Sequence, residues 1–237
     1  MTDLRDRSII IVGATGGLGA PMTRLLAEQG AHLTLVGRSA DRLDELRTTA
    51  GCGDAECVPA DIRKAASAQR VVDAAMSRWG AVDGVIFSAG VVAFGSVAET
   101  EDDILIDLFT LNALAPMRLL RAAQPALRGS AAAGRDPFVL HVSAVVAEQP
   151  MAGMAAYSAA KAALAAYDQA AMREMRREGI RLIDARPPHT ETGLATRPIA
   201  GTAPRMPEGL SPEAVARRML TAIMDGEKDL PSTAFSA

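Results

Sequence analysis

Cysteine and histidine are scarce in this sequence: its 237 residues include only two cysteines and three histidines. Cys52 and Cys57 lie in a glycine-containing stretch with no neighbouring histidine, so they form neither a zinc-binding pattern nor a disulfide framework. The sequence therefore predicts no metal site, and we interpret both cysteines as inert thiols in a reducing cytoplasm.

Long apolar runs and blocks of one charge are also missing. No run approaches the roughly 20 residues that cross a bilayer, and residues 1–5 lack the basic-then-apolar order of a signal peptide. The 25 basic residues are scattered among 28 acidic ones, which gives a net charge of -3 and no basic patch for nucleic acid. We therefore expect a cytoplasmic protein without membrane or nucleic-acid partners.

What is present is an alternation of apolar runs and helical segments. A chain of this length can bury about 70–75% of its unfolded surface in one core, and no repeat or linker divides it, so we expect a single domain over residues 1–237. The strand-like runs are residues 8–12, 32–36, 56–59, 84–87, 138–142 and 180–184. Helical spacing follows the first run up to Gly30 and recurs over residues 39–47, 64–79 and 157–178, and over 101–127 in two pieces broken near 112–116. This alternation predicts an α/β fold, a doubly wound parallel sheet of the Rossmann-like kind with helices on both faces.

A glycine-rich turn connects the first strand to the first helix. Glycines in this position let the backbone approach a pyrophosphate, and the helix N-terminus supplies N–H donors. We therefore expect a dinucleotide in contact with Gly13, Thr15, Gly16, Gly17, Leu18 and Gly19. The turn fits both Gly13-xxx-Gly17-x-Gly19 and Gly13-xx-Gly16-xx-Gly19, so by itself it does not distinguish two kinds of nucleotide-binding fold.

The end of the second strand, Gly37-Arg38-Ser39, indicates which dinucleotide binds. An acidic side chain there would accept a hydrogen bond from the ribose 2′-OH of NAD, and none is present. Gly37 leaves room, and Arg38 offers a planar cation that suits a 2′-phosphate. We therefore expect NADP(H) in preference to NAD(H), with Arg38 and Ser39 at the cofactor.

Tyr157 and Lys161 lie four residues apart at the start of a helix, hence on one face about one turn apart. An ammonium near a phenol lowers the pKa of the phenol from ~10, so that Tyr157 can exchange a proton near neutral pH. Ser143 follows the fifth strand at the sheet edge where ligands of such folds bind. His141 is interpreted as a core histidine. Residues 187–212, rich in Pro, Thr and Gly, predict a lid that covers the substrate.

In this strand order the motifs resemble the short-chain dehydrogenase/reductase family, in its compact single-domain branch, over essentially the whole chain. The resemblance implies that Tyr157 exchanges the proton, Lys161 binds the nicotinamide ribose and tunes Tyr157, and Ser143 holds the substrate oxygen. Asn112 would anchor a water in the proton relay. The implied cofactor site also includes Asp61 and Ile62 at the adenine, Ser88, Ala89 and Gly90 after the fourth strand, and Pro187, Thr190 and Thr192 beside the nicotinamide.

Several positions depart from the family pattern. Ser88 replaces the usual Asn that ties the central strands together, and it can replace part of that hydrogen bonding. Pro188 replaces a usual Gly and stiffens the entry to the lid. Ser143 lies one residue further from Tyr157 than is usual, and Ala144 occupies the commoner serine position. An extra residue in the loop 147–153 is therefore expected to bring Ser143 into register.

These features favour an NADP(H)-dependent oxidoreductase that moves a hydride between nicotinamide and a carbonyl or secondary alcohol, of the carbonyl reductase or alcohol dehydrogenase type. The departures leave open a catalytically weak or inactive dinucleotide-binding sensor or scaffold of the same fold. A nucleotide-sugar epimerase or dehydratase shares the Tyr-Lys pair, but it carries a sizeable extra substrate domain. The roughly fifty residues after the sixth strand leave little room for one.

The helix that begins at Tyr157 carries more small residues than one sheet-facing stripe requires: Ala159, Ala162, Ala163, Ala166, Ala170 and Ala171. Small side chains allow two helices to approach closely across an interface. The resemblance implies that the helix around residues 117–127 pairs with it across a twofold axis. We therefore expect a homotetramer or homodimer, the alternative being close packing of these alanines on the sheet of one chain.

Overall fold

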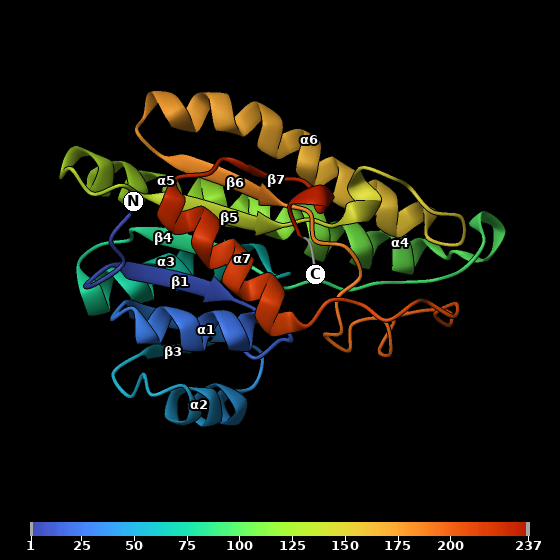
Figure 1. Cartoon of the computed structure of the whole chain (residues 1–237), viewed down its shortest axis with the longest axis horizontal. Coiled ribbons are helices and arrows are strands. Elements are labelled where there is room, and N and C mark those ends of the chain that lie inside the picture. The colour runs from blue at the N-terminus through green and yellow to red at the C-terminus, as the bar shows by residue number, and fades with distance from the viewer. Residues whose placement is uncertain (1, 236–237) are drawn as a thin grey trace.

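The structure is a computed structural model that describes residues 2–235. Within these residues the centre of the molecule is a seven-stranded parallel sheet in the order β3-β2-β1-β4-β5-β6-β7 (Figure 1). The strands are β1 (Ser8–Val12), β2 (His32–Gly37), β3 (Glu56–Pro59), β4 (Gly84–Phe87), β5 (Phe138–Val142), β6 (Arg181–Ala185) and β7 (Asp229–Leu230). The predicted α/β fold with a doubly wound parallel sheet is confirmed.

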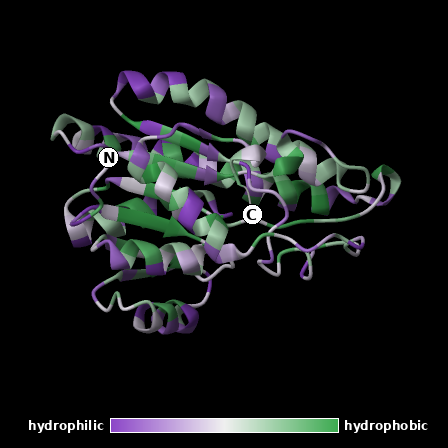
Figure 2. Cartoon of the chain, in the orientation of Figure 1, coloured by the Kyte–Doolittle hydropathy of each residue, from purple (hydrophilic) through white to green (hydrophobic). Residues whose placement is uncertain are grey.

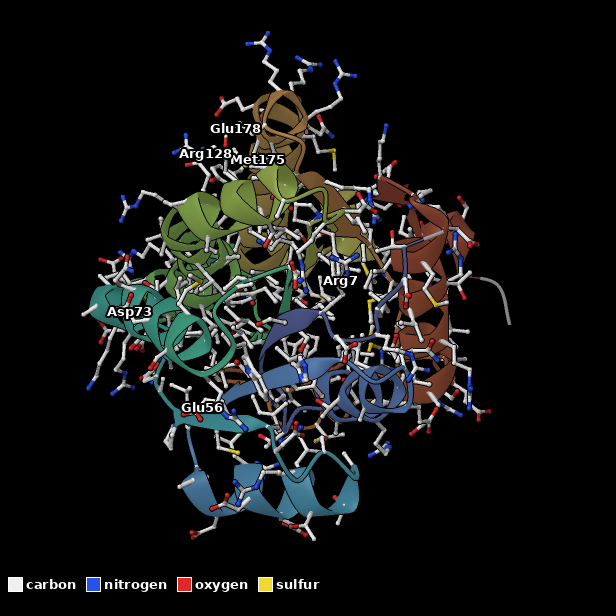
Figure 3. All side chains as sticks on the ribbon, turned by 90° about the vertical axis from the view of Figure 1, so that its left-hand side faces the viewer. Arg7, Glu56, Asp73, Arg128, Met175 and Glu178 are labelled. Atoms are coloured by element: carbon white, nitrogen blue, oxygen red, sulfur yellow. The ribbon has the colours of Figure 1, made fainter. Side chains whose placement is uncertain are left out.

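Helices cover both faces of the sheet. On one face lie α1 (Gly19–Glu28), α2 (Ala40–Thr49) and α7 (Pro212–Asp225), with α1 and α7 side by side. On the other lie α3 (Ala65–Trp79), α5 (Ala115–Ala132) and α6 (Ala155–Arg177), while α4 (Asp102–Phe109) contacts α6. Figure 3 shows Met175 of α6 and Glu178, the residue after this helix, close to Arg128 of α5. None of the described helices is both long enough and apolar enough to span a membrane.

The central strands are continuous apolar runs because both of their faces are covered. In β1, Ile9 and Ile11 pack in the layer of α1 and α7, whereas Ile10 and Val12 pack in the layer of α3 and α5. All four side chains are at most 1% exposed. The strand β1 is accordingly coloured as hydrophobic in Figure 2. This two-sided burial explains why the strands lack the polar alternation of a half-exposed sheet.

The structure also differs from the predicted elements. The helix α7 and the short strand β7 were not predicted, although Ser211 caps α7 by accepting a hydrogen bond from Ala214 N at 3.1 Å and Pro212 is its first residue. The two predicted helical pieces are present as α4 and α5, but the predicted break near residues 112–116 is a π-helical turn, Thr110–Leu114, through which the chain stays helical. A π turn keeps the helix axis but inserts a residue, so it resembles an interruption in the sequence pattern.

The strand order reverses between β1 and β4, which run parallel to each other in the middle of the sheet. Ligands of open α/β sheets bind outside the carboxyl ends of the strands at such a reversal. Ser88 follows β4 there, and its hydroxyl donates to the Val12 carbonyl at 2.9 Å. This bond confirms that Ser88 makes part of the expected tie between the two strands.

Candidate active site

A cavity of about 540 Å³ lies at this edge of the sheet. It extends from the glycine-rich turn after β1, past the ends of β2 and β3, to the start of α6 and the segment 187–206. Among the predicted site residues it brings together Gly13, Thr15, Gly16, Gly17, Leu18, Arg38, Asp61, Ile62, Ser88, Ala89, Gly90, Ser143, Tyr157, Lys161, Pro187, Thr190 and Thr192. Gly19, Ser39 and Asn112 do not line it, and their parts at the cofactor and in the proton relay stay predictions.

The glycine turn needs its glycines for both conformation and close packing. Gly13 has a φ of +79°, and a Cβ there would lie 2.8 Å from the backbone nitrogen of Ala89. A Cβ on Gly17 would collide with Thr192 of the segment 187–212. Gly19 is the first residue of α1, whose N-cap residue makes no side-chain hydrogen bond to the helix. The first N–H groups of α1 are therefore not capped by that side chain, and the turn fits the pyrophosphate of a dinucleotide.

Three arginines lie where β2 and β3 end, and two of them are committed to the protein. The Arg42 guanidinium donates to the backbone of the glycine turn at 2.9 Å. Arg63 holds Asp61 at 2.9 Å, and these hydrogen bonds lower the pKa of that carboxyl. Ser39 accepts from Arg42 N at 3.4 Å as the N-cap of α2, which explains why it does not face the cavity. Within residues 2–235 Arg38 makes no hydrogen bond or ion pair, so it is the guanidinium available to a ligand.

Tyr157 and Lys161 are 6% and 4% exposed, and the Lys161 ammonium lies 6.0 Å from the centre of the Tyr157 ring. Lys161 Nζ donates to the Val142 carbonyl at 2.8 Å. Burial lowers the pKa of Lys161 to about 8, an effect that the charges of Asp184 and Asp168 oppose. Burial also raises the pKa of Tyr157. The expected lowering of the phenol pKa by Lys161 is thus wrong for this structure, because loss of hydration outweighs the ammonium at this distance.

Asn112 lies in the π-helical turn and is 1% exposed. Its Oδ1 accepts from Val91 N at 3.1 Å, and its Nδ2 donates to the Val91 carbonyl at 2.9 Å. A Cβ on Gly90 would lie 3.0 Å from Asn112 Oδ1 and 3.6 Å from Lys161 Nζ. The amide therefore packs directly behind the cavity wall at Gly90, close to the ammonium. Its part in a proton relay stays a prediction.

Ser143 lines the cavity, but its hydroxyl donates to the carboxylate of Asp184, a side chain with no exposed surface. A carboxylate of the neighbouring strand β6 thus engages the hydroxyl proton, and the part of Ser143 in holding the substrate oxygen stays a prediction. Ala144, the next residue, packs against an apolar cluster that contains Met154 and Tyr157. Ala144 therefore places a methyl group next to the Tyr157 cluster, where a serine at this position would place a hydroxyl.

The sequence analysis missed the ionic network around Asp184. Arg186 donates to Asp184 at 2.5 Å, to Glu148 at 2.5 Å and to Asp229 at 2.7 Å, so one guanidinium joins β6, the turn after β5 and β7. Although burial opposes it, the hydrogen bonds to Glu148 and Asp184 raise the pKa of Arg186. The sequence signal for this network is Asp184, a charged residue inside the otherwise apolar strand β6. A buried charge needs a partner, so this residue indicates that a cation lies nearby.

A second buried pair lies under α6. His141 Nδ1 is 2.8 Å from Asp168 Oδ1, and neither residue has exposed surface. This confirms the interpretation of His141 as a core histidine. Burial raises the pKa of Asp168, and the neighbouring His141 opposes that shift. Asp168 and Asp184 both favour the protonated form of Lys161.

Residues of the segment 187–206 form one wall of the cavity. Ile199 N donates to the Val92 carbonyl and Phe94 N donates to the Ala200 carbonyl, each at 2.9 Å. The apolar side chains that line the cavity from this segment and from the segments around Tyr157 are Val92, Phe94, Val146, Met151, Met154, Leu194, Ala195, Ile199 and Met206.

Comparison with known proteins supports the motifs quoted above. The family profile described as short chain dehydrogenase matches residues 7–200. An uncharacterised oxidoreductase of Methylorubrum extorquens is 30% identical over 207 residues, which cover 85% of this chain and 81% of that protein. The ketoacyl reductase HetN of a Nostoc species is 28% identical over 228 residues, 94% of this chain and 77% of that protein.

Solved structures share the fold. The 3-ketoacyl-(acyl-carrier-protein) reductase of Brucella melitensis, complexed with NADH, has a TM-score of 0.86 at 22% identity and covers 98% of this chain and 100% of its own. A short chain dehydrogenase of Burkholderia cenocepacia, in complex with NADP, has a TM-score of 0.82 at 22% identity. The match covers 100% of this chain and 90% of that chain. Both NADH and NADP are thus found among proteins of this fold.

Proposed function

Because this chain belongs to the short-chain dehydrogenase/reductase family and is one of its oxidoreductases, we propose that it is an NADP(H)-dependent carbonyl reductase or alcohol dehydrogenase. The observation that carries the proposal is that one cavity joins the glycine turn, Arg38 and the Tyr157–Lys161 pair. The partner is a small carbonyl or alcohol, which the lid of residues 187–212 covers. When bound, the nicotinamide supplies or accepts a hydride.

Tyr157 is the proton donor to the substrate oxygen during reduction. Its raised pKa keeps the phenol protonated at neutral pH, which is the form that donates. Lys161, held by the Val142 carbonyl, places an ammonium where it stabilises the phenolate left after the transfer. Asp168 and Asp184 help keep that ammonium protonated despite its burial.

The test is consumption of NADPH with a panel of ketones and aldehydes, with NADH measured beside it. We expect turnover of at least one carbonyl class, faster with NADPH than with NADH at equal concentration. Binding of NADPH without turnover of any compound would instead favour the sensor or scaffold alternative, and turnover with NADH alone would contradict the cofactor assignment.

Ala144→Ser is expected to raise kcat/KM for a reduced ketone by about tenfold. The new hydroxyl would give the substrate oxygen a second hydrogen-bond donor, and preorganised donors of this kind are worth roughly 10²–10³ in rate. Ser143→Ala is the matched variant, and we expect little change from it because its hydroxyl is engaged by Asp184. Steady-state kinetics of both variants decides. If kcat/KM falls strongly in Ser143→Ala and does not rise in Ala144→Ser, then Ser143 is the residue that binds the substrate oxygen.

We also propose that the chain forms a homotetramer or homodimer through the outer face of α6. On this helix Ala159, Ala166 and Ala170 are exposed, whereas Ala171 is buried within the chain, so the small residues divide between two faces. Ala166→Arg should dissociate the assembly, because a long charged side chain prevents close helix approach. Sedimentation at micromolar concentration measures this. A single 24.7 kDa species for the unmodified protein would refute the oligomer.

A further inference from the structure

A second cavity, of about 340 Å³, lies next to the one that contains Tyr157. Two side chains, Phe94 and Met154, line both cavities and are 7% and 8% exposed. The other walls are the start of α4 at Ile104, the start of α6, and residues 200–202 of the lid. Phe94 and Met154 also belong to the apolar cluster of Tyr157. The second cavity therefore adjoins the substrate side of the site, and the two cavities share the apolar wall formed by Phe94 and Met154.

The two cavities differ in charge. The first is lined by one carboxylate, Asp61, which pairs with Arg63, and by several basic side chains: Arg38, Arg42, Arg63, Lys161, His189 and Arg197. Among the described residues that line the second, Glu99 is the only one with an ionisable side chain. Its Oε2 accepts from Ser96 N at 3.0 Å and from Ser96 Oγ at 2.7 Å, and these hydrogen bonds lower its pKa. The second cavity thus has an ionised carboxylate and no lining cation.

The N-terminus of α6 at Ala155 also borders this cavity and has no side-chain cap. A helix N-terminus carries about half a positive charge, which favours an anion. The full charge of Glu99 is larger. Among the described groups that border the second cavity, the balance of charge is therefore negative.

We propose that the second cavity binds the far end of the substrate and that this end carries a cationic amine on an apolar stem. The inference rests on the proposed function and names its substrate class: amine-bearing ketones and the corresponding alcohols. The carbonyl lies at Tyr157, the stem contacts Phe94 and Met154, and the ammonium lies near Glu99. An anionic tail of equal length is repelled by the same carboxylate.

Three ketones of equal length, ending in an amine, a methyl group and a carboxylate, test the charge. We expect kcat/KM to be about tenfold higher for the amine than for the carboxylate. Glu99→Gln should reduce that ratio by about fivefold, since the carboxylate is exposed and water weakens its effect. Glutamine also serves in the capping box that Glu99 forms with Ser96, so the local turn is retained. Glu101→Gln removes the same charge from an exposed residue that does not line the cavity, and it should change the ratio much less.

Thr202→Phe tests whether the substrate tail occupies the second cavity, because the phenyl ring would fill part of that cavity at residue 202. It should lower kcat/KM for the long amino ketone while leaving a short methyl ketone nearly unchanged. Calorimetric titration of the amino alcohol, with and without NADP+, measures binding independently of turnover. We expect the amino alcohol to bind to the wild-type protein and to bind with lower affinity to the Glu99→Gln variant.

The outcomes separate the two proposals. If every variant reduces the ketones with a kcat/KM that does not depend on the charge or length of the tail, the assignment of the second cavity is wrong. The proposed function is then unaffected. Binding of the amino alcohol that depends on Glu99, without reduction of any ketone, would support the site and refute the reductase. Neither reduction nor binding would refute both.

Discussion

Tyr157→Phe is expected to lower kcat by about 10²–10⁴-fold, the usual contribution of a positioned acid or base, while the affinity for NADPH stays nearly the same. The phenol hydroxyl is needed to transfer the proton, and its loss removes no apolar contact of the ring with the cluster of Met154 and Phe94. Turnover is measured as NADPH consumption and cofactor affinity by equilibrium titration.

Tyr167→Phe is the matched control, because Tyr167 lies on the same helix α6, is half-buried and does not line the cavity. Burial raises its pKa as it does for Tyr157. We expect normal turnover from this variant. Lys161→Ala should weaken both turnover and NADPH binding. Wild-type activity in Tyr157→Phe, on a substrate that the native protein reduces, would show that the proposed mechanism is wrong.

Arg38→Ala is expected to raise the KM for NADPH by about 10- to 100-fold and to change the KM for NADH little. Hydrogen bonds to charged groups contribute about 1.5–3 kcal/mol, and each 1.4 kcal/mol corresponds to a factor of about ten. The neighbouring guanidiniums cannot replace Arg38 without leaving their partners, since Arg42 holds the glycine turn and Arg63 holds Asp61.

Arg38→Lys keeps the positive charge but not the planar fork, so its KM for NADPH should lie between those of the wild type and Arg38→Ala. The two cofactors are compared at the same ionic strength, because an exposed charge is screened by salt. Equal increases in KM for NADPH and NADH would mean that Arg38 does not contact a 2′-phosphate.

The fold was largely predictable because its signals are local. The runs 8–12, 56–59, 84–87 and 138–142 were predicted with the bounds that the structure gives them. Strands buried on both faces must be apolar at every position, and glycine, proline and capping residues mark where helices stop and start. The helix α7 carried such signals at Ser211 and Pro212, but they stood at the end of an irregular segment and were assigned to the lid.

The site was predictable where one segment carries the chemistry. Tyr157 and Lys161 share a helix turn, and the glycine turn is continuous in the chain, so spacing alone places their groups. Arg38 was identified from the missing acid after β2. That Arg42 and Arg63 are engaged elsewhere, and that Arg38 is not, depends on contacts with residues far along the chain.

Tertiary structure decided the properties that depend on contact between distant segments. Asp184 of β6 engages the hydroxyl of Ser143, a contact between neighbouring strands that residue spacing before Tyr157 does not reveal. Burial of the side chain, and not the neighbouring ammonium, sets the direction of the Tyr157 pKa shift. The second cavity exists because residues 200–202, the start of α4 and the start of α6 meet around Phe94 and Met154. Hydration, hydrogen-bond partners and cavity shape are properties of the packed chain, whereas strand and helix patterns arise from neighbours in sequence.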